Sequence, residues 1–409
     1  MRYPRCIQCT ALTLYSLFVF FCSSSFASET KAWQDIEKEA QGQTVDWYMW
    51  GGSPAVNTFV NGYLATELKN RFDITLRQVP VKDIAEIVSK LAVEKQAGKT
   101  SGGSVDLMWI NGENFRTCKK LNLLHGPITN DLPNSKFLDL TSPVIQTDFG
   151  TPVDNMESPW GSSQLVMIYD SARTPNPPKT ITGLLKWIQE HPGRFTYPAP
   201  PDFTGSAFVR HIFYHKSGSS LKWQNSYTEN ELKNAAEKTF HALNQLKSSL
   251  WRQGDTYPES PVKMDTLFAD REIDFSFSYQ QGAASQNIAD GIFEQSTRTY
   301  VFDSGTISNT HFVAIPYNAE DKSGAMVVAN FLLSPEAQLE KAKGEVWGDF
   351  PVINHEKLSP EWREKFTKLP KGIATLSDQE LQANQLPEPP SEVLIYLEKG
   401  WQEQVLKNR

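Results

Sequence analysis

The sequence predicts an α/β fold with a doubly wound parallel sheet. Strand-like and helix-like segments alternate after residue 43, and each helix is long enough to cross over between parallel strands. A tight turn, Trp50-Gly51-Gly52, follows the first strand, and Pro54 opens a helix just beyond it. In open α/β sheets, ligands bind beside the carboxyl ends of the strands. The expected fold therefore carries a candidate binding loop at the end of its first strand.

The first 27 residues are typical of a secretory signal. Arg2 and Arg5 supply a positive region, 11–22 supplies an apolar core, and Ser25-Phe26-Ala27 is a small-x-small cleavage site. The apolar run is short for a membrane span, and no later segment approaches about 18 continuous apolar residues. We therefore predict cleavage near Ala27 and a periplasmic location.

Cysteine usage points to a mature chain without an intramolecular disulfide. Cleavage near Ala27 removes Cys6, Cys9 and Cys22, so that only Cys118 is left. An oxidising compartment would permit a disulfide, but a single cysteine has no partner within the chain. We expect Cys118 to be a buried, inert thiol. Lipidation of Cys22 is an open alternative to cleavage, although the bulky Phe21 before it fits a lipoprotein signal poorly.

Length and charge narrow the class of protein further. A mature chain of about 380 residues can bury a large core and form two lobes. Loss of Arg2 and Arg5 reduces the 40 basic residues to 38 against 47 acidic ones, which moves the formal charge from −7 to −9. No block of basic residues stands out, so the composition argues against nucleic-acid binding.

The first part of the chain supplies the parallel sheet and its crossover helices. We expect a first strand that ends at Trp50, strands at Ile74–Val81 and Val105–Ile110, and helices at Pro54–Arg71 and Lys82–Ala97. The first helix is amphipathic, because apolar residues recur on one face. These residues are Val56, Phe59, Val60, Tyr63, Leu64 and Leu68.

A second section begins near Pro159. Strands are expected at Gln164–Tyr169, Phe195–Tyr197, Asp274–Tyr279 and Phe312–Pro316. Helices are expected at Thr182–Glu190, Gly205–His215, Tyr227–Leu250, Gly324–Leu333, after Ser334-Pro335, and at Ser391–Leu406. Thr228 and Glu231 form a capping box, and Ser334 caps a helix whose first turn holds a proline. The proline-rich segment Leu386–Pro390 is expected to run over the surface.

Several motifs, in this order and with this spacing, resemble the extracellular solute-binding proteins of ABC importers, and most closely their YnjB-like branch. The resemblance covers essentially the whole mature chain. The motifs are the early WGG loop, VDLMWINGENF at 105–115, PWGSSQLVMIYDSAR at 159–173, TYPAPPDFTGSAF at 196–208, DFSFSY at 274–279 and ANFLLSPEAQ at 329–338.

The resemblance implies a two-lobed periplasmic-binding fold of type II that closes on a ligand by hinge motion. Lobe one would comprise 28–158 and 305–409, and lobe two would comprise 159–304. The hinges would lie near Ser158–Gly161 and Asp303–Ser308. The implied partners are a small solute and an inner-membrane ABC permease with its ATPase. We expect a monomer without a cofactor.

Two candidate loops lie at strand ends of the first lobe. Trp50 could cover a ligand, while Gly51 and Gly52 offer close backbone hydrogen bonds; a tight turn beside a core tryptophan is the alternative. The second loop, Asn111-Gly112-Glu113-Asn114, places Asn111 and Glu113 at a helix start. Helix capping and a favourable dipole contact explain these residues equally well.

Two further loops are expected to face the first two. Asp202, Thr204, Gly205 and Ser206 surround a helix start near Thr204 or Gly205, where free N–H groups can bind carboxylate or phosphate oxygens. The alternative is an ordinary N-cap by Thr204. The fourth loop offers Tyr279 for stacking and Gln280 for hydrogen bonding.

Trp160 and Trp347 are additional candidates for ligand contact. Trp160 lies at the first crossing between the expected lobes, and Trp347 lies in a loop before Pro351. Large aromatic residues more often pack in a core, so this alternative competes with ligand binding at both positions.

Metal and catalytic signatures do not stand out. His211 and His215 lie four residues apart on an expected helix, but no carboxylate or cysteine nearby completes a metal site, so we expect none. Walker, H-E-x-x-H and G-x-S-x-G motifs are absent from the sequence. A glycosidase-like pair of carboxylates is an open alternative, and nothing marks one.

The expected site favours an organic cation or amine, of a polyamine-like or thiamine-like kind. Its loops contain Glu113, Asp202 and Asp349 together with many aromatic residues, which suits cation–π and carboxylate contacts. An anion is the alternative, because the helix start near Gly205 suits one and Arg116 or Arg210 could reach inward. A sugar would also stack on aromatic faces. Less expected is an exported hydrolase that uses two carboxylates.

Overall fold

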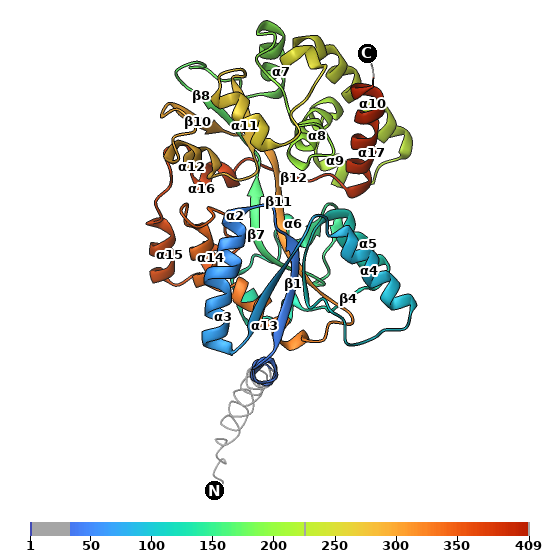
Figure 1. The fold of residues 1–409 in the computed structure, drawn as a ribbon, viewed down its shortest axis with the longest axis vertical. Helices are drawn as coiled ribbons and strands as arrows, with labels where there is room; N and C mark the ends of the chain where they lie inside the picture. The colour runs from blue at the N-terminus through green and yellow to red at the C-terminus, as the bar shows by residue number, and fades with distance from the viewer. Residues whose placement is uncertain (2–32, 225, 408–409) are drawn as a thin grey trace.

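The computed structural model describes residue 1 and residues 33–224 and 226–407. The expected signal segment, its cleavage near Ala27 and Cys22 lie outside the described residues. Figure 1 shows two α/β bodies stacked along the long axis of the molecule, with β7 and β11 running between them. Within the described part of the chain, no helix is both long and apolar enough to cross a membrane.

The first body is built on the predicted parallel sheet. Strands β1 (Thr44–Trp50), β2 (Thr75–Val81) and β3 (Leu107–Ile110) pair in parallel, with β1 in the middle, as the alternation of strands and helices predicts. The sheet continues through β11 (Thr306–Pro316), which runs antiparallel to β3, so the complete sheet is mixed.

Helices cover the sheet of the first body much as their apolar faces predict. The predicted helix from Pro54 consists of α2 (Pro54–Thr58), the π-helical η1 (Phe59–Leu64) and α3 (Ala65–Phe72) in direct succession. Its predicted inward residues Val56, Phe59, Val60, Leu64 and Leu68 are fully buried in one core. The remaining helices of this part are α4 (Ala85–Gln96), α5 (Gly112–Lys120) and α6 (Pro143–Gln146), and its short strands are β4 (Leu124–His125), β5 (Thr147–Asp148) and β6 (Thr151–Pro152).

The second body holds an antiparallel three-stranded sheet with its own core. Strand β8 (Val166–Asp170) lies between β10 (Thr297–Tyr300) and β9 (Phe275–Ser278). The helices around it are α7 (Ile181–Glu190), α8 (Phe203–Ser217), α9 (Leu221–Gln224), α10 (Glu229–Leu246), α11 (Pro261–Ala269) and α12 (Ala283–Ala289). The predicted strand Phe195–Tyr197 is wrong: these residues have no strand partner, although Phe195 and Tyr197 are buried in the core.

Two long antiparallel strands connect the bodies. Strand β7 (Ser158–Gln164) pairs with β11 from Ser308↔Gln164 to Val313↔Ser158, with a bulge at His311/Phe312. The predicted strand at Phe312–Pro316 is therefore too short, because β11 begins at Thr306. The mostly polar segment from Thr306 to His311 resembles a loop in the sequence, but its backbone pairs with β12 from Thr306 to Ser308 and with β7 from Ser308 onward.

The C-terminal part of the chain contributes to both bodies. Helices α13 (Lys322–Leu332) and α14 (Pro335–Ala342) return to the first body, and Ser334 caps α14 as predicted. They are followed by α15 (Pro360–Thr367), α16 (Asp378–Gln382), β12 (Gln385–Pro387), α17 (Ser391–Trp401) and the π-helical η7 (Gln402–Leu406).

Helix α17 corrects the expected division into lobes. Val393, Leu397 and Trp401 lie in the core of the second body, and α17 stands beside α10 in Figure 1. The indole N–H of Trp401 donates to the Tyr197 hydroxyl at 3.0 Å. The final helix therefore does not belong with 305–409 in the first lobe, because its apolar face is buried against α8 and α10.

Candidate functional site

The loop after β1 presents an exposed indole held against a glycine. The Trp50 side chain is 51% exposed. A Cβ at Gly52 would lie 2.2 Å from Cζ2 of Trp50, and one at Gly51 would lie 2.6 Å from Cβ of Pro80, so a side chain at either position would force a neighbour to move. The Gly51 carbonyl accepts a hydrogen bond from Asn57 Nδ2 at 2.9 Å. The close backbone approach here is made to Trp50 and Pro80 themselves.

The loop after β3 is fixed by residues far away in the sequence. Asn111 does not cap α5 with its side chain. Its Nδ2 donates to the Thr310 carbonyl at 2.6 Å, and its Oδ1 accepts from Trp109 Nε1 at 3.2 Å. Asn111 is therefore anchored to β11, while Glu113 in the first turn of α5 is exposed.

The Asp148 carboxylate, rather than the Asn111 side chain, caps the start of α5. Gly112, at φ +62°, donates its N–H to Asp148 Oδ2 at 2.6 Å. Burial raises the pKa of Asp148 to about 8, and the hydrogen bonds from Gly112 and Asn111 oppose that rise. Burial also raises the pKa of the neighbouring Glu157 well above its usual range, with the Asp148 charge adding to the effect. A pair of acidic groups thus lies directly behind the Asn111 loop.

The start of α8 differs from the prediction. The helix begins at Phe203, and Asp202 is its N-cap, accepting from the Gly205 N–H at 2.8 Å. Thr204 is half-buried and Ser206 is buried. Because the Asp202 carboxylate already occupies the helix N-terminus, this end of α8 is a poorer anion site than the sequence indicated.

The loop after β9 is also engaged by the chain itself. The Tyr279 hydroxyl donates to Glu388 Oε1 at 2.8 Å, and the Tyr279 ring lies 5.0 Å from that of Phe203. Gln280 is exposed, and its N–H donates to Ser278 Oγ at 3.0 Å. Of these residues, Gln280 and the 44% exposed Phe203 are open to solvent.

Trp160 and Trp347 lie in the core of the first body rather than on an open surface. Trp160 is fully buried and Trp347 is 9% exposed. The ammonium of Lys341 lies 5.7 Å from the Trp160 ring centroid and 5.5 Å from that of Trp347, and it pairs with Asp349. Lys341 therefore lies over the rings of Trp160 and Trp347, which were expected to contact a ligand.

Strand β11 contributes polar side chains to the candidate site that were not predicted from the sequence. Asn309 and His311 are two residues apart on this strand, so their side chains share one face. Asn309 Oδ1 accepts from Ser163 Oγ at 3.0 Å and its Nδ2 donates to Glu388 at 3.3 Å, whereas His311 Nε2 lies 3.1 Å from Asp349. These two residues were not predicted because the polar segment that contains them resembles a hinge loop in the sequence.

Hydrogen bonds and ring contacts join three of the four predicted loops. Asn111 is bound to β11, Tyr279 reaches β11 through Glu388 and Asn309, and the Phe203 ring at the start of α8 lies 6.3 Å from that of Phe149 in the first body. The Trp50 loop shares the same sheet edge as Asn111, because β1 and β3 are parallel neighbours in register. Glu388, the lone charged residue in Leu386–Pro390, was a signal available to sequence reasoning.

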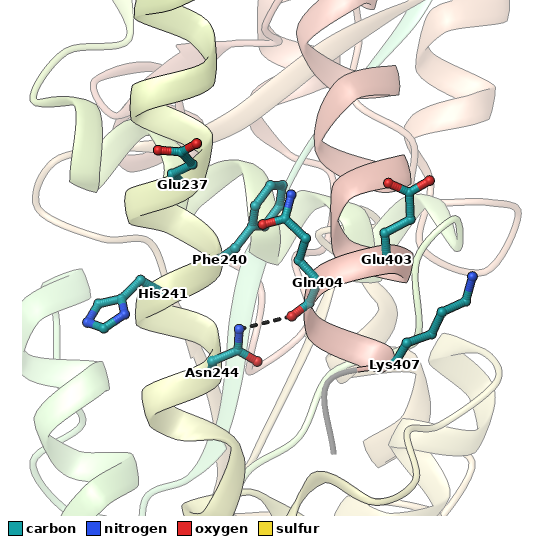
Figure 2. A pocket seen from close by; sticks show the side chains of 7 residues that line it. All are labelled: Glu237, Phe240, His241, Asn244, Glu403, Gln404 and Lys407. Carbon is teal, nitrogen blue, oxygen red and sulfur yellow. Dashed lines mark hydrogen bonds between the residues drawn. The ribbon is translucent and has the colours of Figure 1, made fainter.

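One cavity lies away from these loops. It has a volume of about 520 Å³ and lies between α10 and η7 on the second body (Figure 2). Its lining residues are Glu237, Phe240, His241, Asn244, Glu403, Gln404 and Lys407. Asn244 Nδ2 bonds across it to the Gln404 carbonyl at 3.0 Å. None of the predicted site residues lines this cavity, so it lends them no support.

The histidine pair has a structural explanation. His211 is buried; its Nδ1 lies 2.7 Å from the Ala207 carbonyl and its Nε2 accepts from the Ile307 N–H at 3.0 Å. Burial lowers the pKa of His211 to about 4. His215 Nε2 is 3.4 Å from Thr182 Oγ1. Both nitrogens of His211 are engaged, and among the described residues no group of three metal-ligating side chains is found.

Comparison with known proteins gives consistent matches over most of the chain. The family model for bacterial extracellular solute-binding proteins matches residues 63–370. Protein YnjB of Escherichia coli strain K12 is 39% identical over 363 residues, which are 88% of this chain and 92% of that protein.

Solved structures agree on the fold. The spermidine/putrescine ABC transporter substrate-binding protein PotD from Streptococcus pneumoniae strain Canada MDR_19A matches with a TM-score of 0.62 at 17% identity, covering 88% of this chain and 99% of that one. A periplasmic thiamin binding protein matches with a TM-score of 0.55 at 17% identity, covering 88% of this chain and 96% of that one. Similarity at this level confirms the predicted periplasmic-binding fold.

Proposed function

The chain belongs to the family of bacterial extracellular solute-binding proteins, and from this premise we propose that it captures one small solute at the junction of its two bodies. It would then deliver the solute to an inner-membrane ABC permease with its ATPase. The family is one of binding proteins, so the chain is a receptor rather than an enzyme. We further propose that it acts as a monomer in the periplasm after cleavage near Ala27.

The proposed site lies at the junction of the two bodies, beside β7 and β11, and includes the four candidate loops. These two strands are the only long strands that run between the bodies among the described residues, so movement of one body against the other would bend them or their ends. Trp50, Asn111 and Glu113 would contribute from the first body. Thr204 and Gln280 would contribute from the second.

Three basic side chains near the junction support an organic cation as the solute. Arg210 pairs with Glu388, Arg116 pairs with Glu392, and Lys341 pairs with Asp349. Because each cation is matched by a carboxylate of the chain, none is left to attract an anionic solute. This pairing is the single observation that carries the proposed solute class.

Exposed groups at the junction add to this argument. Trp50 and Phe203 offer aromatic faces to solvent, and Glu113 offers an exposed carboxylate at the start of α5. Cations bind aromatic faces with about 0.5–2 kcal/mol each. Asp202 and Asp349 no longer contribute, because one caps α8 and the other neutralises Lys341. Two structural neighbours, a spermidine/putrescine substrate-binding protein and a thiamin binding protein, are in line with an organic cation.

A ligand panel tests the proposal directly. The purified mature chain is heated with putrescine, spermidine, thiamine, neutral amino acids, sugars, sulfate or succinate, and the melting temperature is recorded. A solute at 100 times its dissociation constant adds about 2.7 kcal/mol to the free energy of unfolding. We expect amines or thiamine to raise the melting temperature. A response to oxyanions or sugars alone would show that the proposed solute class is wrong.

A further inference from the structure

Glu388 is held like a bound carboxylate ligand. It lies between β12 and α17, and its side chain is 3% exposed. Arg210 Nη1 donates to Oε2 at 2.7 Å, while the Tyr279 hydroxyl and Asn309 Nδ2 donate to Oε1 at 2.8 Å and 3.3 Å. The three donors come from α8, the loop after β9, and β11. They converge on one carboxylate from separate elements of the fold.

The donors are positioned by contacts that do not involve Glu388. Arg210 Nη2 donates to the Phe203 carbonyl at 3.0 Å and to the Tyr279 hydroxyl at 3.2 Å. The guanidinium carbon lies 4.9 Å from the centroid of the Phe203 ring. Asn309 is held by Ser163. Removal of the Glu388 carboxylate would therefore leave the three donors in place.

The Arg210 guanidinium also has a nitrogen that is free to form a further hydrogen bond. Arg210 is fully buried, and its Nε has no hydrogen-bond partner among the residues that the structure describes. Glu388 engages a single nitrogen of the guanidinium, although a carboxylate can bind two of them side by side. Burial raises the pKa of Glu388, and the charge of Arg210 opposes that rise.

We propose that Arg210, Tyr279 and Asn309 form a carboxylate-binding site that Glu388 of the C-terminal segment occupies from within. The chain thereby fills with its own carboxylate the position in which an acidic solute could bind. This internal occupant excludes carboxylate-bearing solutes from the junction, a consequence that rests on the proposed function. The binding of a carboxylate by the three donors does not depend on it.

Chemical rescue tests the site. Glu388→Ala removes the carboxylate and leaves the donors, and its melting temperature is measured in sodium acetate, sodium formate and sodium chloride at equal ionic strength. We expect the variant to melt well below wild type in chloride, and acetate or formate to restore much of the loss with a saturable dose dependence. Acetamide, which has the same shape without the charge, restores nothing.

Matched controls separate a site from a general salt effect. Glu392→Ala removes an exposed carboxylate paired with Arg116 only four residues further on, so its melting temperature should not distinguish acetate from chloride. Glu388→Asp keeps a carboxylate and should not respond either. Glu388→Ser also removes the carboxylate, and its short hydroxyl side chain leaves the three donors without their acceptor, so it should show the same acetate response as the alanine variant.

The outcomes are decisive for the inference. Equal melting temperatures in acetate and chloride for folded Glu388→Ala or Glu388→Ser overturn it. If Glu388→Ala is unfolded in chloride, refolding from urea in acetate supports the site, and failure to refold in both salts together with an unresponsive Glu388→Ser overturns it. If acetate rescues the variant while no amine binds wild type, the proposed function fails and the carboxylate site stands.

Discussion

The ammonium of Lys341 and the carboxylate of Asp349 form an ion pair that is almost completely buried, with side-chain exposures of 1% and 5%. The pair lies against the backbone of β7, where a Cβ at Gly161 would be 2.2 Å from Asp349 Oδ2. Burial lowers the pKa of Lys341, and the Asp349 charge opposes that change. The indoles of Trp160 and Trp347 surround the ammonium. One ion pair thus explains both the tryptophan and the glycine of the Trp160-Gly161 motif.

Lys341→Ala should strongly destabilise the fold. It leaves Asp349 buried without its cation, and the loss of one partner from a buried ion pair costs about 3–5 kcal/mol. Urea unfolding followed by tryptophan fluorescence measures the change. Lys368→Ala is the control, because the Lys368–Glu364 pair is exposed at 73% and 63% and should contribute about 0–1 kcal/mol. Equal losses in the two variants would contradict the role given to the buried pair.

Gly161→Ala should destabilise the fold through steric overlap. The new Cβ would lie 2.2 Å from Asp349 Oδ2 and 2.6 Å from Lys341 Nζ, both of which are fixed by their pairing. Overpacking of this kind costs about 1–3 kcal/mol of unfolding free energy. Gly344→Ala is a matched control, since nothing lies within 4 Å of its Cβ. A Gly161→Ala variant as stable as the control would show that β7 adapts without cost.

Trp50→Ala should weaken binding without weakening the fold. Its indole is 51% exposed, so its removal exposes little new apolar surface. We expect at least a roughly tenfold loss of affinity for the amine that binds best, which is about 1.4 kcal/mol. Calorimetric titration gives the affinity, and Val93→Ala on α4, 64% exposed in wild type, is the control. Unchanged affinity would make the loop purely structural.

The contribution of Asp148 to the stability of the protein should fall as pH rises from about 4 to 8. Burial raises the pKa of Asp148 from 3.8 to about 8, so over this window the folded state keeps a proton that the unfolded state has lost. This stability is complete below pH 3.8 and is lost as pH approaches 8. One such proton contributes a slope of up to about 1.4 kcal/mol per pH unit.

Asp148→Asn should flatten this profile, so that its stability relative to wild type improves between pH 5 and pH 8 by roughly the share that one proton contributes. Urea unfolding at several pH values measures the slope. Glu157 shifts in the same direction, so the double variant Asp148→Asn/Glu157→Gln should be flatter again. Parallel profiles for wild type and Asp148→Asn would show that Asp148 is ionised in the folded protein.

Cys118 should be inert in the folded protein. Burial raises the pKa of its thiol to about 12, so almost no thiolate is present at neutral pH. Iodoacetamide at pH 8 should leave Cys118 unmodified in the native protein and alkylate it after unfolding in urea, as read by mass spectrometry. Alkylation at equal rates in the two states would mean that the thiol is accessible.

The features that depend on local sequence pattern were predicted correctly from the sequence. The alternating start of the chain predicted β1, β2 and β3 in parallel, and the apolar period predicted the buried face that includes Val56 and Phe59. The Thr228–Glu231 capping box is present as expected. These features follow from neighbours close in sequence, where side-chain period and capping chemistry act directly.

Features that depend on contacts between distant segments could not be predicted in this way. Helix capping was one explanation of Asn111 in the sequence, but its side chain binds the carbonyl of Thr310, almost 200 residues later. From the sequence, Trp160 was a candidate for ligand contact, but Lys341 of α14 lies over its ring. Glu388 was expected to lie in a segment on the surface, but its carboxylate is buried and accepts hydrogen bonds from three donors. In each case the partner is chosen by packing, which a local pattern does not encode.

The return of α17 to the second body makes the two cores interleave along the sequence. The core around β8 includes Leu397, Trp401 and Val405, which follow α13 and α14 in the sequence. The core of the first body includes residues of α13 and α14, which follow β10, the last strand of the second body's sheet. Neither core can therefore be completed by one continuous stretch of chain. Folding of each body requires the docking of a segment that the other body separates from it in the sequence.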